Sequence, residues 1–519
     1  MSLPILPQHT KKRKSKRPTF PIRNRDGPPP ISKLNDDLLW RIFNLNTLTD
    51  TDMIKNLSSS EFSLTTARHT SQVCAGWRSL MLASSSLWAS TINLKHLEQK
   101  NDNWRDEILK RTGNALISIG GRLEKGGHAA QFFLSLLGEH WTRLRRLSIH
   151  VEDPVIAEDE RWLSVHTPAP NLEIFYVWFS SPPAFSTADD VLFSNDAPSM
   201  HTLVTHKINF KLSERWLTGL RRLDLFGCSV EKTILFALAE MLALESLDMM
   251  NIDIIDVHTE DRLWPMIILP KLKRISLSVN LTTLTALIGY IYPTLGCTFE
   301  YESCNDKISL PTTEDIFLLR RGFSTHFQCF SDFWHNDTIS WMMTEDILEL
   351  TNVLKAGGNS AFYVHIEIER GSPWHVIPNI ILHSLYSYDL RRITTLELDI
   401  SQDALDVCDW YFAKFLRSLS SVATMHTDSS TMQVLVHLQE DLLNGEILFS
   451  SLKSIVFDTD AELICSAIMQ FLLQRRDAGV PITDFDLYDC TSPNQDRLLF
   501  LEGIKGLDVD WNEEIRNGM

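Results

Sequence analysis

Apolar residues alternate with polar ones in short runs that return at near-regular intervals through most of the chain. The first clear run is Leu144-Arg145-Arg146-Leu147-Ser148-Ile149, and the alternation predicts a half-buried strand. Related runs start at Leu172, Met200, Leu220, Leu244 and Leu272, then at Tyr363, Ile393, Val422, Leu452 and Ile482. Successive starts lie 28, 28, 20, 24 and 28 residues apart in the first series and 30, 29, 30 and 30 in the second. We expect each unit to be a strand backed by an apolar stretch such as residues 234–238, so that stacked units bury one continuous core.

The chain before these runs has the period of helices. Asn35 or Asp36 can cap a helix in which Leu38, Leu39, Ile42 and Phe43 recur at helical spacing. Val73, Cys74, Trp77, Leu80 and Met81 form the apolar stripe of a second amphipathic helix, which the run Ser84–Ser86 is expected to end before Leu87-Trp88. Two such short helices cannot bury their apolar faces alone, so they need the following domain and a partner.

The residues of these helices carry a specific resemblance. The run Leu34, Asp36-Asp37, Ile42-Phe43, Val73-Cys74, Trp77-Arg78 and Leu87-Trp88 resembles an F-box, with Asn35 where proline is usual and a polar insert over about 44–66. The resemblance implies docking to a Skp-type adaptor, and through it to a cullin and a RING subunit of a ubiquitin ligase. The implied adaptor-binding residues are Leu34, Leu38, Ile42, Phe43, Val73, Trp77, Leu87 and Trp88. An ordinary helical hairpin in a larger domain is the alternative.

The repeated strands resemble an irregular leucine-rich-repeat solenoid, an α/β fold with parallel strands on the concave face and helices or loops on the convex face. This gives four predicted segments: a basic tail at 1–30, the F-box module at 31–94, the solenoid at 95–512 and a C-terminal tail at 513–519. Residues 298–362 fit either two degenerate repeats near Phe299 and Ile339 or a loop insertion. A mixed α/β domain whose strands mimic a repeat is the alternative for the whole region.

In this register the third, fifth and seventh positions of each unit point away from the core. In the first half they include arginine and aromatic residues, namely Arg146, Tyr176, Trp178, Arg222 and Phe226. In the second half eight of fifteen are carboxylates and none is Lys or Arg, with Glu367, Glu397, Asp399, Asp458, Asp484 and Asp486 as the predicted substrate-binding members. Aromatics suit a binding hot spot and a carboxylate row favours a basic partner segment, although solvated strand faces are often charged without a partner.

Basic residues are concentrated at the N-terminus, and the rest of the chain is acidic. Residues 1–30 carry eight basic side chains and one acidic, and because the whole chain has a formal net charge of −17, the remainder carries −24. The cluster Lys11 to Arg17 indicates either a nuclear localisation signal or a solvated tail, so the nucleus or the cytoplasm is expected. A strongly acidic body argues against extended nucleic-acid binding. No apolar run reaches the length of a membrane span, and the first residues lack the apolar stretch of a secretory signal.

The sequence contains few of the motifs that indicate a catalytic or metal-binding site. There is no phosphate-binding loop, nucleophile elbow or H-E-x-x-H pair, and the eight cysteines form no C-x-x-C pair, so no catalytic residue, metal or cofactor is assigned. Asp484, Asp486 and Asp489 alternate with apolar residues as a strand does, which explains them better than a metal site. The sequence therefore predicts a non-catalytic substrate receptor of a ubiquitin ligase. The alternatives are a repeat scaffold outside any ligase and an enzyme whose α/β fold imitates repeats.

Overall fold

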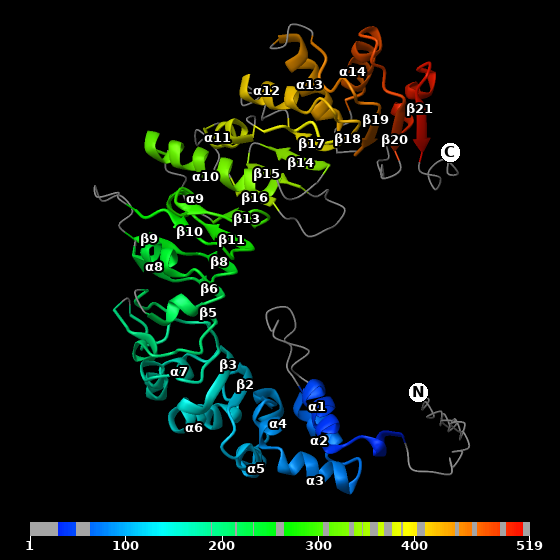
Figure 1. Ribbon diagram of the computed structural model, residues 1–519. Coiled ribbons are helices and arrows are strands. Elements are labelled where there is room, and N and C mark those ends of the chain that lie inside the picture. The colour runs from blue at the N-terminus through cyan, green and yellow to red at the C-terminus, as the bar shows by residue number, and fades with distance from the viewer. Residues whose placement is uncertain are drawn as a thin grey trace, which may run out of the picture.

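The computed structural model forms an arc with strands along its inner side and helices along its outer side (Figure 1). It describes residues 30–47, 63–187, 189–212, 215–231, 233–255, 264–304, 311–331, 337–344, 346–352, 362–367, 376–385, 388–401, 410–441, 446–458, 464–487 and 495–511. The basic cluster Lys11 to Arg17, nearly all of the predicted tail 1–30 and the whole C-terminal tail 513–519 lie outside these ranges.

Four short helices begin the described chain. They are α1 (Asp36–Thr47), α2 (Ser63–Thr70), α3 (Ala75–Ala83) and α4 (Ser85–Ala89). Asn35 caps α1 as predicted, because its Oδ1 accepts a bond of 2.9 Å from the Leu38 N–H. The prediction for the second helix was wrong at its start and confirmed at its end. Val73 precedes α3, whose N-cap is Cys74, and α3 ends at Ala83 with Ser84 of the serine run as its C-cap; Ser85 then begins α4.

One large sheet of 17 strands follows. In spatial order its first nine strands are β1 (Ile92–Asn93), β2 (Ile117–Leu123), β3 (Leu144–Val151), β4 (Ile174–Phe179), β5 (Thr202–His206), β6 (Arg222–Phe226), β8 (Ser246–Met250), β11 (Arg274–Val279) and β13 (Thr298–Ser303). The remaining eight are β16 (Phe362–Glu367), β15 (Ile347–Thr351), β14 (Thr338–Met343), β17 (Thr395–Ile400), β18 (Thr424–Thr427), β19 (Ser454–Phe457), β20 (Asp484–Leu487) and β21 (Asp508–Trp511). Every predicted unit start leads into one of these strands, so the periodicity and the α/β class are confirmed.

In the middle of the sheet the spatial order of the strands differs from their order in the sequence. The segments near Phe299 and Ile339 are indeed strands, but β14, β15 and β16 lie in reverse spatial order between β13 and β17. Among the described strands of this sheet, β15 alone runs antiparallel to its neighbours. The sheet also begins earlier than predicted, because β1 lies inside the segment assigned to the F-box module and already pairs with β2.

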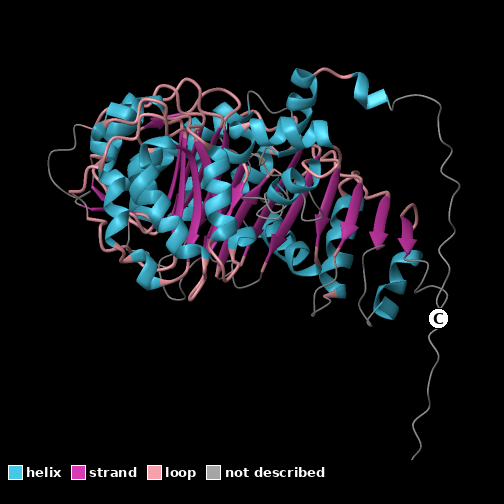
Figure 2. Cartoon of the chain, turned by 90° about the horizontal axis from the view of Figure 1, so that it is seen from below, coloured by secondary structure: helices cyan, strands magenta, loops and turns pink. Residues whose placement is uncertain are grey.

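Helices and turns cover the outer face of the sheet (Figure 2). The α-helices there are α5 (Asn103–Thr112), α6 (Ala129–His140), α7 (Pro154–Ala157), α8 (Ile234–Glu240), α9 (Leu281–Ile288), α10 (Thr313–Ser331), α11 (Val376–Leu385), α12 (Trp410–Ser418), α13 (Ser429–Asp441) and α14 (Cys465–Asp477). Short 3-10 helices include η3 (Leu94–Leu97), η5 (Glu160–His166), η6 (Leu192–Asn195), η7 (Arg215–Gly219) and η9 (Gln495–Gly503). Two small parallel pairs, β7 (Ser229–Glu231) with β9 (Asp253–Ile255) and β10 (Ile267–Ile268) with β12 (Ile291–Tyr292), complete the fold.

Burial follows the alternation along many of the strands, although β5, β6, β14 and β17 also bury one residue of the other face. In β4, Phe175, Val177 and Phe179 are buried, whereas Ile174, Tyr176 and Trp178 are half-buried. The buried set joins the core between sheet and helices, and the other set lies on the inner, concave face of the arc. The concave face therefore carries the strand side chains that do not belong to this core.

Candidate protein-interaction surfaces

The four N-terminal helices share a small core. Leu39 and Phe43 of α1 are buried with Leu64, Ala67 and Met81. The Phe43 ring meets the half-buried Trp77 ring of α3 edge to face, with centroids 4.8 Å apart. These contacts use only one side of α1.

A second side of α1 is apolar and exposed. Leu38, Ile42 and Leu45 follow one another at i, i+4 and i+7 and are 45%, 38% and 68% exposed, and we call them the α1 stripe. Val73, just before α3, is 62% exposed. Clustered apolar side chains that remain exposed in a folded module mark an interaction site. Leu45 was missed from the sequence, although its place three residues after Ile42 is a signal that could have found it.

Three residues that were predicted to bind the adaptor lie inside the helical module and not on its surface. Phe43 is 2% exposed and Leu87 and Trp88 are fully buried, so the prediction that they contact a partner directly is corrected. The Trp88 indole N–H donates to the Met81 carbonyl at 2.8 Å, and the Arg111 guanidinium lies over its ring at 4.5 Å. These large apolar side chains hold the module together from inside. Leu34 and Trp77 are partly buried and contribute only their outer edges to the surface.

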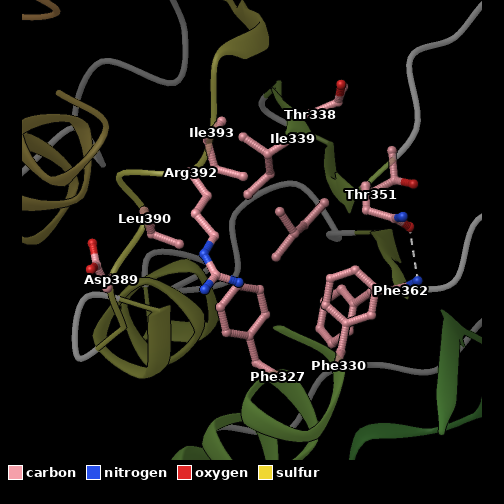
Figure 3. Close-up of a pocket in the computed structure, with 12 residues that line it drawn as sticks. Phe327, Phe330, Thr338, Ile339, Thr351, Phe362, Asp389, Leu390, Arg392 and Ile393 are labelled. Atoms are coloured by element: carbon pink, nitrogen blue, oxygen red, sulfur yellow. Dashed lines mark hydrogen bonds between the residues drawn. The ribbon is translucent and has the colours of Figure 1, made fainter. Parts of the chain in front are cut away.

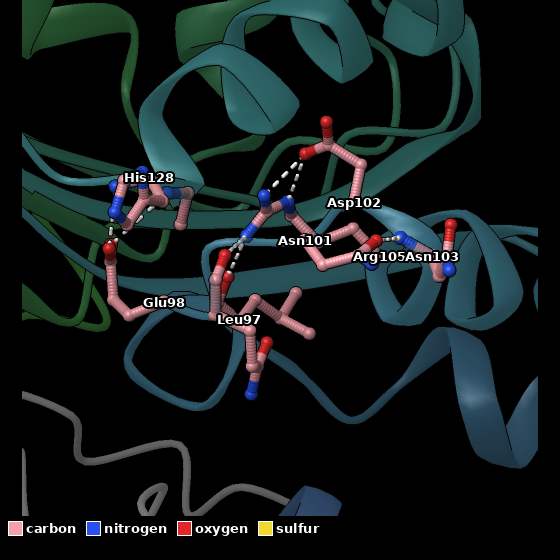
Figure 4. Close-up of polar contacts among 9 residues, drawn as sticks. Leu97, Glu98, Asn101, Asp102, Asn103, Arg105 and His128 are labelled. Atoms are coloured by element: carbon pink, nitrogen blue, oxygen red, sulfur yellow. Dashed lines mark hydrogen bonds and ion pairs between the residues drawn. The ribbon is translucent and has the colours of Figure 1, made fainter.

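The junction between the helices and the sheet is tightly bonded (Figure 4). Arg105 of α5 is 2% exposed; its guanidinium donates to the carbonyls of Leu97 and Gln99 and pairs with Asp102. The Glu98 carboxylate accepts bonds from the backbone N–H groups of His128, at 2.6 Å, and Ala129, at 3.3 Å, where α6 begins. These bonds hold the segment between β1 and β2 and the start of α6. The four N-terminal helices contact this segment through α5, where Arg111 lies over Trp88 at 4.5 Å and Trp104 lies 5.6 Å from the Arg68 guanidinium.

The concave face of the first half is built as predicted. Arg146, Tyr176, Trp178, Arg222 and Phe226 all lie on it and are half-buried. Strand register aligns the concave residues in rows. The middle row is Ser148, Tyr176, Val204, Asp224, Asp248, Ser276 and Glu300, and the terminal row is His150, Trp178, His206, Phe226, Met250, Ser278 and Glu302.

Aromatic rings stack along the terminal row. Trp178 lies parallel to His206 with centroids 3.9 Å apart, and it reaches Phe226 at 5.3 Å. The His150 ring meets Trp178 edge to face at 6.2 Å. Burial lowers the pKa of both His150 and His206, so these rings favour the neutral form and join an apolar ridge.

The arginines of the first half have acidic partners. Arg222 pairs with Asp224 at 2.7 Å, Arg274 with Glu300 at 2.8 Å, and Arg145 with Glu173 at 2.9 Å. The basic character predicted for this half is therefore largely compensated within the sheet. The aromatic ridge is its distinctive feature instead.

The second half is acidic on its concave face. The strands from β13 to β21 contain no Lys or Arg, and their carboxylates are Glu300, Glu302, Glu349, Glu367, Glu397, Asp399, Asp484, Asp486, Asp508 and Asp510, which we call the acidic face. Glu367 and Asp484 are exposed and Asp399 and Asp486 half-buried, as the sequence predicted. Asp458 lies one residue beyond β19 and is exposed. Glu397 is only 6% exposed, so its predicted direct contact with substrate is corrected.

The negative charge of this face shifts the pKa values of neighbouring groups. The hydrogen bond that the His365 imidazole donates to the Glu349 carboxylate, followed by the charges of Glu349, Glu302 and Glu367, raises the pKa of His365, against the effect of burial. Burial and then the charges of Glu349 and Glu302 raise the pKa of Tyr363 to about 12. Both shifts indicate a negative potential that favours cations here.

A small cavity opens where the strand order reverses (Figure 3). It encloses about 50 Å³ among Phe327, Phe330, Ile339, Phe362 and Leu390, with Asp389 and Arg392 at its rim. This volume is far below the roughly 300 Å³ of an ordinary ligand site. In the part of the chain that the structure describes, no group of three or more metal-ligating side chains is present and no helix is long and apolar enough to cross a membrane.

Comparison with known proteins does not decide among functions. No protein-family model matches the chain, and no curated protein matches it. The surfaces described above therefore carry the functional argument.

Proposed function

We propose that this protein is the substrate-recognition subunit of a Skp–cullin–F-box ubiquitin ligase, in which the N-terminal helices are an F-box and the sheet is an irregular leucine-rich-repeat solenoid. The α1 stripe is the observation that carries the proposal. It leaves three large apolar side chains exposed on a helix whose Leu39 and Phe43 are buried in the module. A groove on a Skp-type adaptor would bury them, as helix-in-groove recognition does.

The bonded junction supports the same proposal mechanically. A ligase receptor performs no bond chemistry; it holds a target lysine near the charged ubiquitin carrier, so that attack becomes effectively intramolecular. That role needs a fixed distance between adaptor and substrate. Trp88 of α4 and Arg68 of α2 pack on Arg111 and Trp104 of α5, at 4.5 and 5.6 Å, and this contact between the helices and the start of the sheet suits a rigid spacer.

Affinity purification of the intact chain from cells tests the proposal. We expect the adaptor, a cullin and a RING subunit among the retained proteins, identified by mass spectrometry. Depletion of the chain should lengthen the half-life of at least one retained protein. Purification without adaptor and cullin would reject the F-box, whereas their presence with unchanged half-lives of every partner would favour a scaffold without ligase function.

The acidic face is expected to bind the basic part of the substrate. Asp484 and Asp508 are exposed register partners on β20 and β21, so the pair Asp484→Asn and Asp508→Asn removes two adjacent charges without steric change. We expect substrate recovery to fall about threefold to tenfold at low salt while adaptor recovery is unchanged. The pair Glu240→Gln and Glu502→Gln, exposed outside the concave strands, is the control. Equal recovery with both pairs would exclude the acidic face as the substrate site.

A further inference from the structure

A carboxylate on the concave face of the first half has no partner of its own. Asp248 lies on β8, between Asp224 of β6 and Ser276 of β11 in the register. Within the described part of the chain its half-buried side chain makes no hydrogen bond or ion pair. A half-buried charge that is left unpaired is costly, so its presence calls for a functional reason.

The neighbouring arginines are paired with other carboxylates. Arg222 donates to Asp224 Oδ2 from Nε at 2.9 Å and from Nη2 at 2.7 Å, and Arg274 reaches Glu300 at 2.8 Å. Asp224 itself is fully buried, and its Oδ1 has no hydrogen-bond partner. Because Asp224 Oδ1 is itself buried, Asp248 is the member of this adjacent pair whose oxygens a bound side chain can reach, and Asp224 adds negative charge next to it.

Apolar and aromatic side chains border these carboxylates. Phe226 and Met250 follow Asp224 and Asp248 two residues later on the same strands, and Trp178 reaches Phe226 with centroids 5.3 Å apart. Tyr176 lies in the same row as Asp224; burial and then the charge of Asp224 raise its pKa. Carboxylates set beside aromatic rings form the surface that a long cationic side chain fits, with its stem on the rings and its charged group on the acids.

We propose that Asp248, with Phe226, Trp178 and Met250 near it and the buried Asp224 adding negative charge, forms a subsite for one lysine or arginine side chain of the bound protein. This inference rests on the receptor role of the concave face and identifies one residue class that the receptor selects. The two carboxylates exclude a phosphate or another anion at this position. The subsite lies among the aromatic rings of the first half, near Glu300 at one end of the acidic face and many strands from Asp484 and Asp508 at the other end.

Binding at this subsite depends on pH. Asp248 is faced by Asp224 and Arg222 from β6, Arg274 from β11 and Glu300 from β13. Burial and the charge of Asp224 raise the pKa of Asp248 to about 6. Asp248 is therefore ionised and able to pair at pH 7.5, and it becomes protonated as the pH falls through 6. Affinity should drop about tenfold between pH 7.5 and pH 5.

An oriented peptide library tests the subsite on the full-length chain. Nine-residue peptides, random except for a central lysine, arginine, norleucine or citrulline, are passed over the immobilised chain, and the retained fraction of each set is measured. Norleucine and citrulline keep the shape of lysine and arginine without their charge. We expect the lysine or the arginine set to be retained at least about tenfold better than its neutral counterpart at pH 7.5. The preference should persist in the chain that carries Asp484→Asn and Asp508→Asn, which lowers the contribution of the acidic face, and it should fall at least about threefold when Asp248→Asn is added to that pair.

Either of two results would overturn the subsite: equal retention of charged and neutral sets, or a charge preference that Asp248→Asn leaves intact. Misfolding is not expected to confuse the result, because Asp248→Asn removes an uncompensated charge and should leave the melting temperature equal or higher at pH 7.5. The library uses the chain alone. Absence of a charge preference in the natural chain would therefore reject the subsite and leave the ligase proposal intact. Failure to recover adaptor from cells would reject the ligase proposal and leave the subsite intact.

Discussion

Replacing Leu38 and Ile42 together by serine is expected to reduce binding of the Skp-type adaptor by at least about 100-fold. Each side chain would bury apolar area in the adaptor groove worth about 1.5–3 kcal/mol, and two such losses exceed the 2.7 kcal/mol of a 100-fold change. Both residues are substantially exposed in the free chain, so the substitutions should cost little folding free energy. Recovery of adaptor in a pull-down, together with the melting temperature of the purified chain, measures the two effects separately.

The matched control is the pair Leu163→Ser and Leu242→Ser. These leucines are 53% and 57% exposed but lie far from α1 in the sequence, on η5 and just after α8. The control variant should bind adaptor as the natural chain does. Equal loss in both variants would point to a general effect of lowered surface hydrophobicity, and full binding by the α1 variant would reject the F-box assignment.

Trp77 is a poorer position for this experiment, although its place in the F-box-like run is conspicuous. Its ring packs on Phe43 inside the module, so Trp77→Ala would open a cavity and destabilise α1 and α3 together. Loss of binding would then follow from partial unfolding. Substitutions on the exposed face of α1 test adaptor binding with little effect on stability. The structure shows which residues of α1 are exposed, whereas the order of residues in the sequence does not.

Local pattern was enough to predict most strands. The alternation of Leu147, Ile149 and Val151, or of Phe485 and Leu487, has the period of a pleated strand, and only such a period can keep one face in the core. The near-constant spacing indicated a repeat, and the resemblance to leucine-rich repeats implied that the strands would be parallel neighbours. Asn35 was a reliable helix start for an equally local reason, since its side chain bonds to the first turn.

Non-local choices could not be predicted in this way. Alternation in β14, β15 and β16 is the same whether these strands pair in sequence order or in reverse, because pairing depends on the connections between them. The sequence pattern also failed to predict which charged side chains are buried, because their burial depends on the neighbouring strands. Glu397 and Asp224 occupy concave positions in the sequence pattern, but neighbouring strands cover them almost completely. The pairing of Arg274 with Glu300 depends on register across 26 residues.

Arg475 on α14 is expected to be one of the most sensitive positions for stability. Its side chain is fully buried, and the guanidinium donates to the carbonyls of Leu448, Phe449 and Leu452 at 2.8, 3.0 and 3.1 Å. These carbonyls belong to the turn that leads into β19. Burial lowers the pKa of Arg475 to about 10, which leaves it charged at neutral pH. The Arg475 guanidinium therefore supplies these carbonyls with the hydrogen bonds that backbone N–H groups would supply in a helix or a strand.

Arg475→Met keeps most of the buried volume and removes all three donated bonds, so we expect the free energy of unfolding to fall by about 2–4 kcal/mol. Amide hydrogen exchange should accelerate in β18, β19 and β20 and remain unchanged in β3 to β6, because each strand pairs only with its neighbours. The adjacent Arg476→Met is the control, since Arg476 is exposed and pairs only with Asp477 at 2.9 Å among the described residues; it should cost less than about 0.5 kcal/mol. Equal exchange in the two variants would mean that solvent or backbone groups satisfy the turn, and that the guanidinium does not hold it.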